Sequence, residues 1–263
     1  MKLKTKIMGV LNINSDSFFK NSRINEEKAK EKIELMINDG ADIIDIGGLS
    51  SRPGSESISQ EDELERIKST IDIIYKNKFY ERAVFSLDSY SPLCLDYALY
   101  HKFKIVNDIT GLSNDEVCKV SKKYNATVCI MHMKGSPKDM QENPTYEDVV
   151  SEVNEFFAKR INKAKSFGLN DLILDVGIGF GKTLEHNIEL IKHHRDFLHF
   201  GYPLLIGASR KSMIDKLSPS NIEDRLPGTL VVHLEAVRQG ASIVRCHDVK
   251  EHLQALRVFE ALS

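Results

Sequence analysis

The chain has 263 residues and a formal net charge of −2, with 41% hydrophobic and 28% charged residues. This length and composition fit one large domain with a sizeable core better than two small domains. The sequence has no clustered basic tract, which argues against a nucleic-acid partner. No apolar run approaches the length needed to cross a bilayer, and the N-terminus has no cleavage pattern, so we expect a cytosolic protein.

Eight short apolar runs, rich in β-branched residues, recur along the chain and are separated by longer segments with helical spacing. The runs cover residues 6–11, 42–47, 83–88, 104–108, 126–132, 172–175, 203–208 and 242–247. Helical spacing is clear over residues 26–38, 61–76 and 146–167, and glycine closes several such segments, as at a helix C-terminus. Eight βα units predict a closed (β/α)8 barrel, the TIM-barrel architecture, formed by residues 1–263 as one domain.

An open doubly wound sheet would also alternate strands with helices, but it ordinarily needs a switch point and often a glycine-rich first turn. The first turn here is Asn12-Ile13-Asn14-Ser15-Asp16, which contains no glycine. We therefore favour the barrel. The polar stretch 217–227 is expected to be an ordinary connection within the βα series.

Four cysteines lie far apart in the sequence and form no Cys-x-x-Cys pair: Cys94, Cys118, Cys129 and Cys246. Their spacing suggests neither a zinc site nor a disulfide framework. Because free cysteine is among the most buried residue types, we expect ordinary thiols in or near the core.

Polar residues follow almost every proposed strand, at the rim that carries the active site in this fold. They are Asn12, Ser50, Arg52, Asp88, Asn107, Asp108, His132, Asp175, Ser209, Arg210, Lys211, Arg245 and His247. Any one of them could be a satisfied structural group, because strand ends also need caps and turns. Their recurrence on one rim is nevertheless a functional signal.

The chemistry of this rim is mixed. Asp88, Asn107 and Asp175 can exchange hydrogen bonds with a flat heterocycle. An anion can be bound by the basic side chains of the rim, Arg52, Lys211, Arg245 and His247. Because barrels often bind phosphate after strands seven and eight, we expect a phosphorylated substrate.

Two motifs are interpreted as structural. Residues 177–183, Gly-Ile-Gly-Phe-Gly-Lys-Thr, resemble a phosphate loop, but that loop requires glycine where Val176 stands, so we expect a tight turn. His193 and His194 occupy adjacent positions of a helical segment and point in different directions. We expect them on a solvated face and not at a metal site, and the sequence shows no other metal-ligand spacing.

Ordered segments over essentially the full chain resemble the motifs of dihydropteroate synthases. The segments are 8–18 (MGVLNINSDSF), 45–54 (DIGGLSSRPG), 86–89 (SLDS), 106–109 (VNDI), 131–137 (MHMKGSP), 174–182 (LDVGIGFGK), 207–213 (GASRKSM) and 244–249 (VRCHDV). They follow one another in the order of the family, and this makes the resemblance specific.

The resemblance implies a division of the rim among two substrates and one metal ion. The pterin ring would be held by Asp88, Asn107, Asp175, Lys211 and Arg245, of which Asp88, Asp175, Lys211 and Arg245 would be catalytic. Pyrophosphate would be received by Asn12 with Mg²⁺ and by Arg52, Arg245 and His247. The p-aminobenzoate pocket would be bordered by Ser51, Arg52, Pro53, Phe180, Lys211 and Ser212.

The resemblance also implies the reaction. 6-Hydroxymethyl-7,8-dihydropterin pyrophosphate and p-aminobenzoate would give 7,8-dihydropteroate and pyrophosphate in folate biosynthesis, with sulfonamides as competitors. In the dissociative mechanism of the family the bond to pyrophosphate breaks first, and the arylamine then attacks the pterin cation. No protein nucleophile is required, so no Ser or Cys triad is assigned. Family members are usually homodimers formed through helices on the outside of the barrel.

Two other functions are open at this stage. A non-catalytic pterin-binding barrel is suggested by Leu49, where the second loop commonly has glutamate, and by residues 19–25, which replace an expected glycine pair. A pterin-dependent methyltransferase would share the acids that hold pterin but would not require Arg52, Lys211 or the Arg245-x-His247 pair. Turnover would decide between these functions and the synthase.

Overall fold

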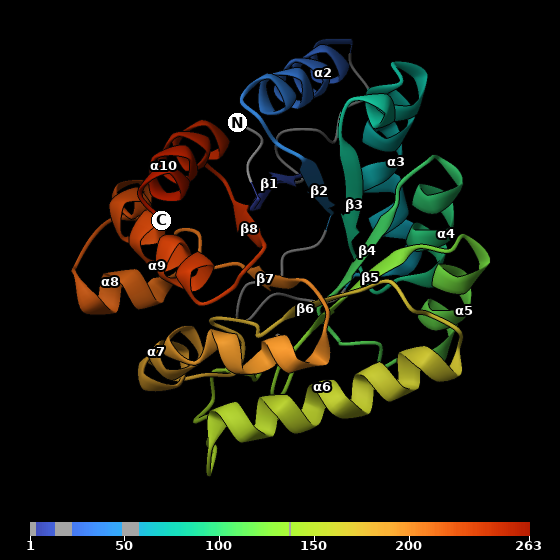
Figure 1. Ribbon diagram of the computed structural model, residues 1–263. Helices are drawn as coiled ribbons and strands as arrows, with labels where there is room; N and C mark the ends of the chain where they lie inside the picture. Colours follow the sequence, from blue (N-terminus) through green and yellow to red (C-terminus); the bar gives the residue numbers. More distant parts are fainter. Residues whose placement is uncertain (1–3, 14–22, 49–57, 137) are drawn as a thin grey trace.

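The computed structural model describes residues 4–13, 23–48, 58–136 and 138–263, with only the backbone described for 23–25. Eight parallel strands pair in sequence order and close into a barrel (Figure 1). They are β1 (Lys6–Asn12), β2 (Ile43–Gly47), β3 (Val84–Asp88), β4 (Ile105–Asp108), β5 (Thr127–Met131), β6 (Leu172–Asp175), β7 (Leu204–Ile206) and β8 (Ile243–Cys246). The predicted barrel is confirmed, with each strand inside or within one residue of its expected range.

Helices follow the strands and surround the barrel (Figure 1). The α-helices are α2 (Arg23–Asn38), α3 (Gln60–Lys76), α4 (Pro92–Tyr100), α5 (Asp115–Lys123), α6 (Val149–Ser166), α7 (Leu184–Lys192), α8 (Ser212–Leu217), α9 (Leu226–Arg238) and α10 (Val249–Leu262). Short 3-10 turns are η1 (Phe79–Glu81), η2 (His194–Phe200) and η3 (Ile222–Asp224). The stretch 217–227 is the expected connection: it runs from the last residue of α8 to the first turn of α9 and contains η3.

Apolar side chains fill the barrel interior, which is why the chemistry of this fold has to lie at the rim. One cluster contributes a side chain from every strand except β3: Met8, Ile43, Ile105, Cys129, Ile173, Leu205 and Ile243. A larger cluster fills the layer between strands and helices, and it includes fully buried Ile7, Ile44 and Phe157. Strands buried on both faces carry near-continuous apolar runs, as in Ile43-Ile44-Asp45-Ile46, which only Asp45 interrupts.

The expectations outside the site have mixed outcomes. All four cysteines are buried free thiols, as predicted. His193 is exposed, but His194 is fully buried and its ring lies near Phe197, so the expected solvated face is wrong for His194. The reason is that the chain turns into η2 at His194 and directs this side chain inward. Among the described residues, no helix is both long and apolar enough to cross a membrane.

Candidate active site

The strand register places four predicted or neighbouring rim residues side by side. Asn12 pairs with Gly47, Gly47 with Asp88, and Asp88 with Asn107, at the C-terminal ends of β1 to β4. Gly47 leaves room between its neighbours: a Cβ on it would lie 3.4 Å from Oδ1 of Asn12 and 3.9 Å from Oδ2 of Asp88. An amide, a carboxylate and a second amide therefore line one arc of the rim.

Arg245 connects this arc to β8. Its Nε donates to Oδ2 of Asp45 at 2.7 Å, and its Nη2 lies 2.7 Å from Oδ2 of both Asp45 and Asp88. The same Oδ2 of Asp45 accepts a hydrogen bond from Nδ2 of Asn107 at 3.0 Å. Asp45 is completely buried, two residues below the end of β2. It is thus the common anchor of Arg245 and Asn107.

Two carboxyl groups of the rim, those of Asp88 and Asp175, have raised pKa values. Burial raises the pKa of Asp88 to about 7, and the guanidinium of Arg245 opposes that rise. Burial also raises the pKa of Asp175, against the opposing charge of Lys211 and a hydrogen bond from the Gly177 N–H. For Arg245, burial alone would lower the pKa, but the two carboxylates beside it raise the value overall. Arg245 is therefore a permanent cation beside Asp88, whose carboxyl group can change charge near neutral pH.

Lys211 precedes α8 and reaches across to the loop after β6. Its Nζ donates to the carbonyl oxygen of Ile178 and lies 4.4 Å from the centroid of the Phe180 ring. Burial lowers the pKa of Lys211 to about 8, although the nearby charge of Asp175 acts in the opposite direction. Gly207 separates Asp175 from Arg245, since a Cβ there would lie 3.9 Å from Oδ2 of Asp175 and 3.8 Å from Cβ of Arg245.

The loop after β6 is shaped around Lys182, which is 2% exposed. The Nζ of Lys182 lies 2.9 Å from Nδ1 of His132 and 3.2, 3.0 and 2.9 Å from the carbonyl oxygens of His132, Gly177 and Phe180. Burial lowers the pKa of His132 to about 2, so the imidazole is neutral and can accept at Nδ1. The expected tight turn is confirmed, with a positive φ of 67° at Gly177. No phosphate loop forms here, because the Nζ of Lys182 donates to backbone carbonyl oxygens of the protein itself.

Ser209 and His247 form a pair at the ends of β7 and β8. The Ser209 hydroxyl lies 2.9 Å from Nδ1 of His247, and its oxygen accepts the His247 backbone N–H at 3.2 Å. A hydroxyl has one proton and two lone pairs, so Ser209 can donate to Nδ1 of one His247 tautomer or accept from Nδ1–H of the other. His247 is exposed at the rim, next to the buried end of β8.

The structure brings most of the predicted site residues together. Three of the predicted rim residues instead make contacts that stabilise the protein itself. Asp108 accepts from the Thr110 N–H at 2.7 Å and from the Leu112 N–H at 2.9 Å, which is a turn-stabilising role. His132 binds Lys182, and Arg210 pairs with Asp248. The predicted Ser50, Ser51, Arg52 and Pro53 lie outside the described residues.

Sequence reasoning missed Asp45 and the role of Lys182. The importance of Asp45 could have been predicted, because a carboxylate inside an otherwise apolar buried strand needs a buried partner. Lys182 had none, since its acceptors are backbone carbonyls that the pattern of side chains cannot reveal.

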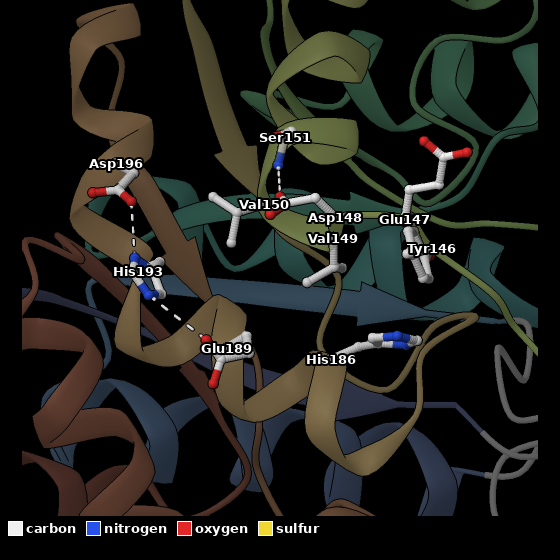
Figure 2. Close-up of a pocket in the computed structure, with 10 residues that line it drawn as sticks. All are labelled: Tyr146, Glu147, Asp148, Val149, Val150, Ser151, His186, Glu189, His193 and Asp196. Carbon is white, nitrogen blue, oxygen red and sulfur yellow. Dashed lines mark hydrogen bonds and ion pairs between the residues drawn. The ribbon is translucent and has the colours of Figure 1, made fainter.

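A separate cleft of about 420 Å³ lies on the outside of the barrel, between the start of α6 and α7 (Figure 2). Its lining contains none of the predicted site residues: it consists of Tyr146, Glu147, Asp148, Val149, Val150, Ser151, His186, Glu189, His193 and Asp196. In this cleft His193 bridges two carboxylates, with Nδ1 3.0 Å from Asp196 and Nε2 3.6 Å from Glu189 (Figure 2). Within the described residues, no group of three or more His, Cys, Asp or Glu is placed to hold a metal ion.

Comparison with known proteins gives the family of the chain. Residues 8–247 match the family described as pterin binding enzyme. The chain is 42% identical to the dihydropteroate synthase of Escherichia coli K12, over 97% of this chain and 90% of that protein.

Solved structures give the same assignment. The chain superposes with a TM-score of 0.90 on the Yersinia pestis dihydropteroate synthase in a sulfonamide complex, with 35% identity over 100% of this chain and 96% of that one. The Thermus thermophilus dihydropteroate synthase in complex with 4-aminobenzoate gives a TM-score of 0.88, with 32% identity over 98% and 95% of the two chains. The chain therefore belongs to the pterin-binding enzymes and, among them, to the dihydropteroate synthases, which are transferases of folate biosynthesis.

Proposed function

We propose that this chain condenses 6-hydroxymethyl-7,8-dihydropterin pyrophosphate with p-aminobenzoate and releases pyrophosphate. The observation that carries the proposal is the bipolar rim, in which the acids and amide of β3, β4 and β6 adjoin the cations that follow β7 and β8. The ligands of the two relatives, a sulfonamide and 4-aminobenzoate, support the arylamine as second substrate and sulfonamides as competitors.

The pterin end of the site is formed by Asp88, Asn107 and Asp175. Carboxylates accept from the amino group and ring N–H groups of a pterin, and the Asn107 amide can both donate and accept. A ring that lacked these groups would leave buried polar atoms unpaired, and this penalty is the source of specificity for a pterin. Lys211 lies between Asp175 and the loop after β6, where its ammonium can meet the pterin carbonyl.

The leaving-group end is formed by Arg245, His247 and Lys211. When the bond to pyrophosphate breaks, negative charge grows on the leaving oxygen, and fixed cations and donors near that oxygen lower the barrier. The carboxylates of Asp88 and Asp175 favour the positive charge that spreads into the pterin. No nucleophilic side chain is needed for this dissociative mechanism.

Mg²⁺ fits this site as a companion of the diphosphate. Asn12 offers one amide oxygen at the open position over Gly47, and Mg²⁺ is usually bound by one or two protein oxygens together with substrate phosphates and water. When bound, the ion would neutralise charge on the departing pyrophosphate. Asn12 would then orient the diphosphate toward Arg245 and His247.

The arylamine would lie between Phe180, Lys211 and the exposed Ser212. The aromatic face of Phe180 suits the flat ring of p-aminobenzoate, and Lys211 over that face suits its carboxylate. Ser51, Arg52 and Pro53 complete the proposed pocket, and they lie outside the described residues.

The assembly and location of the protein remain predictions. We propose a homodimer formed through helices on the outside of the barrel, and sedimentation equilibrium would measure the mass in solution. The cytosolic location expected from the sequence can be checked by cell fractionation.

The test is a turnover assay with purified protein, both substrates and Mg²⁺, in which pyrophosphate and dihydropteroate are followed together. Both products should appear in equal amounts, and Lys211→Ala should lose nearly all activity. Lys216→Ala is the matched control, because Lys216 is exposed on the same short helix α8. If the pterin diphosphate binds but no dihydropteroate forms, the non-catalytic function is correct and the synthase proposal is wrong.

A further inference from the structure

Two buried histidines outside the proposed substrate contacts join the end of β7 to the start of α10. The backbone N–H of Ala208 donates to Nε2 of His233 on α9 at 3.0 Å, and Nδ1 of His233 lies 2.8 Å from Nε2 of His252 on α10. Nδ1 of His252 lies 2.7 Å from the carbonyl oxygen of Asp248. Both imidazoles are 1% exposed. These bonds form one continuous path, which we call the histidine relay.

The direction of every bond in the relay follows from its two backbone ends. The Ala208 N–H can only donate, so Nε2 of His233 has no proton, and a neutral His233 carries its proton on Nδ1. That proton points to Nε2 of His252, which must therefore accept. His252 then carries its proton on Nδ1 and donates to the Asp248 carbonyl, which can only accept.

The lowered pKa values of His233 and His252 agree with these hydrogen-bond directions. Burial lowers the pKa of His233, and the nearby His252, Lys211 and His247 lower it further. Burial also lowers the pKa of His252, although the carbonyl and carboxylate of Asp248 and the carboxylate of Glu251 act in the opposite direction. A proton added to either ring would place two N–H groups against each other, so the relay requires both imidazoles to be neutral.

A second connection reaches Asp248 from the same segment. Nε of Arg210 donates to Oδ2 of Asp248 at 3.1 Å, and Nη2 donates to Oδ1 at 2.5 Å. Arg210 has a φ of 58°, an unusual conformation for a residue other than glycine, and its N–H donates to the Thr229 hydroxyl at 3.0 Å. Ala208 and Arg210 are thus both tied to Asp248, one through the relay and the other directly.

Ser209 lies between these two tied residues, and its partner His247 is next to Asp248. We propose that His233 and His252 are positioning residues, whose relay keeps the Ser209–His247 pair aligned for the departing diphosphate. The inference rests on the proposed function, because it assigns the purpose of the relay to the leaving-group end of that site. Neither histidine is among the residues proposed to contact substrate, and the two acids and the amide that would hold the pterin lie on other strands, β3, β4 and β6.

The first test is the tautomeric state of the wild-type protein, measured by imidazole ¹⁵N NMR with the peaks assigned through His233→Leu and His252→Leu. Both rings should carry their proton on Nδ1 at neutral pH. A proton on Nε2 of either ring would overturn the relay. This measurement does not depend on any ligand, so it stands even if the proposed function fails.

The second test compares the binding of pterin pyrophosphate with that of 6-hydroxymethyl-7,8-dihydropterin, which has the same ring but no diphosphate. His252→Leu removes both hydrogen bonds of this ring, and this should weaken the binding of pterin pyrophosphate about tenfold and leave that of the alcohol unchanged. An equal loss for both ligands, or no loss, would overturn the positioning role. His194→Leu is the matched control, because His194 is fully buried yet makes no side-chain hydrogen bond. Wild-type protein that does not bind pterin pyrophosphate would instead refute the proposed function.

Discussion

Arg245 and Asp45 are 200 positions apart in the sequence, yet Nε of Arg245 donates to Oδ2 of Asp45 at 2.7 Å. This bond fixes the guanidinium and leaves Nη2 to reach Asp88 as well. Asn107 is held by the same Asp45 oxygen. A residue below the rim therefore sets the geometry of three residues proposed to bind the pterin diphosphate.

Asp45→Asn should reduce kcat/KM by roughly 10- to 100-fold, the range that follows from weakening one or two charge-assisted hydrogen bonds. The amide oxygen can still accept from Arg245 and Asn107, and its NH2 group can take the place of Oδ1, which has no partner. The change therefore removes charge while retaining shape. Steady-state kinetics with both substrates would measure it.

The matched control is Asp42→Asn. Asp42 lies just before the same strand and accepts the Ile7 N–H at 2.9 Å, at the opposite end of the barrel from the rim. This control should keep kcat/KM within about twofold, since surface substitutions have small effects. If the two variants behaved alike, Asp45 would have no special role in the site.

Gly177→Ala should be far more destabilising than Gly201→Ala. Both glycines have positive φ, 67° and 76°, so both changes strain the backbone by about 1 kcal/mol. A Cβ at Gly177 would also lie 1.9 Å from the His132 carbonyl oxygen, whereas at Gly201 nothing lies within 4 Å. Urea unfolding would compare the pair, and equal midpoints would show that the loop after β6 can move away from His132.

The barrel could be predicted from the sequence because strands buried on both faces leave a local record. Runs such as Ile43-Ile44-Asp45-Ile46 read as buried strands without knowledge of their neighbours. The rim could be predicted for the same reason, since Asp88 and Asp175 end their strands and Asn107 is the last residue but one of β4.

Contacts between distant segments could not be predicted from the local sequence pattern. His233 and His252 lie on helices where each would pass for an ordinary core residue, and only the packing of α9 against α10 shows that their rings meet. The predicted exposure of His194 is wrong because the helical spacing of the sequence continues past Lys192, whereas α7 ends at that residue. The partners of a buried polar side chain depend on tertiary structure, which the local pattern does not contain.

Lys182→Met should lower the free energy of unfolding by about 3 kcal/mol or more, because three buried carbonyl oxygens lose the Nζ donor. It should also raise the KM for p-aminobenzoate more than the KM for the pterin diphosphate, since Phe180 lies in the loop that Lys182 organises. Denaturation and kinetics on one preparation would measure both effects. Lys192→Met, at an exposed lysine of α7, is the control, and a similar loss in the two variants would contradict this account.

The affinity for 6-hydroxymethyl-7,8-dihydropterin should depend on pH through Asp88 and Lys211. Burial raises the pKa of Asp88 to about 7, so the carboxylate that accepts from the pterin is lost as pH falls below that value, and affinity should drop about tenfold per pH unit. Burial lowers the pKa of Lys211 to about 8, so its charge is lost as pH rises above that value. Binding should therefore be strongest between about pH 7 and 8. A ligand without diphosphate excludes titration of the leaving group from the measurement.

Isothermal titration across this pH range would separate the two groups with two variants. Asp88→Asn should bind more weakly at pH 8 and lose the decline on the acid side, because an amide does not titrate, while the decline on the alkaline side remains. Asp96→Asn, at an exposed carboxylate that pairs with Lys123 on the outer surface, should reproduce the wild-type profile. An acid limb that persisted in Asp88→Asn would mean that another carboxyl group, with Asp175 the nearest candidate by its own raised pKa, controls pterin binding.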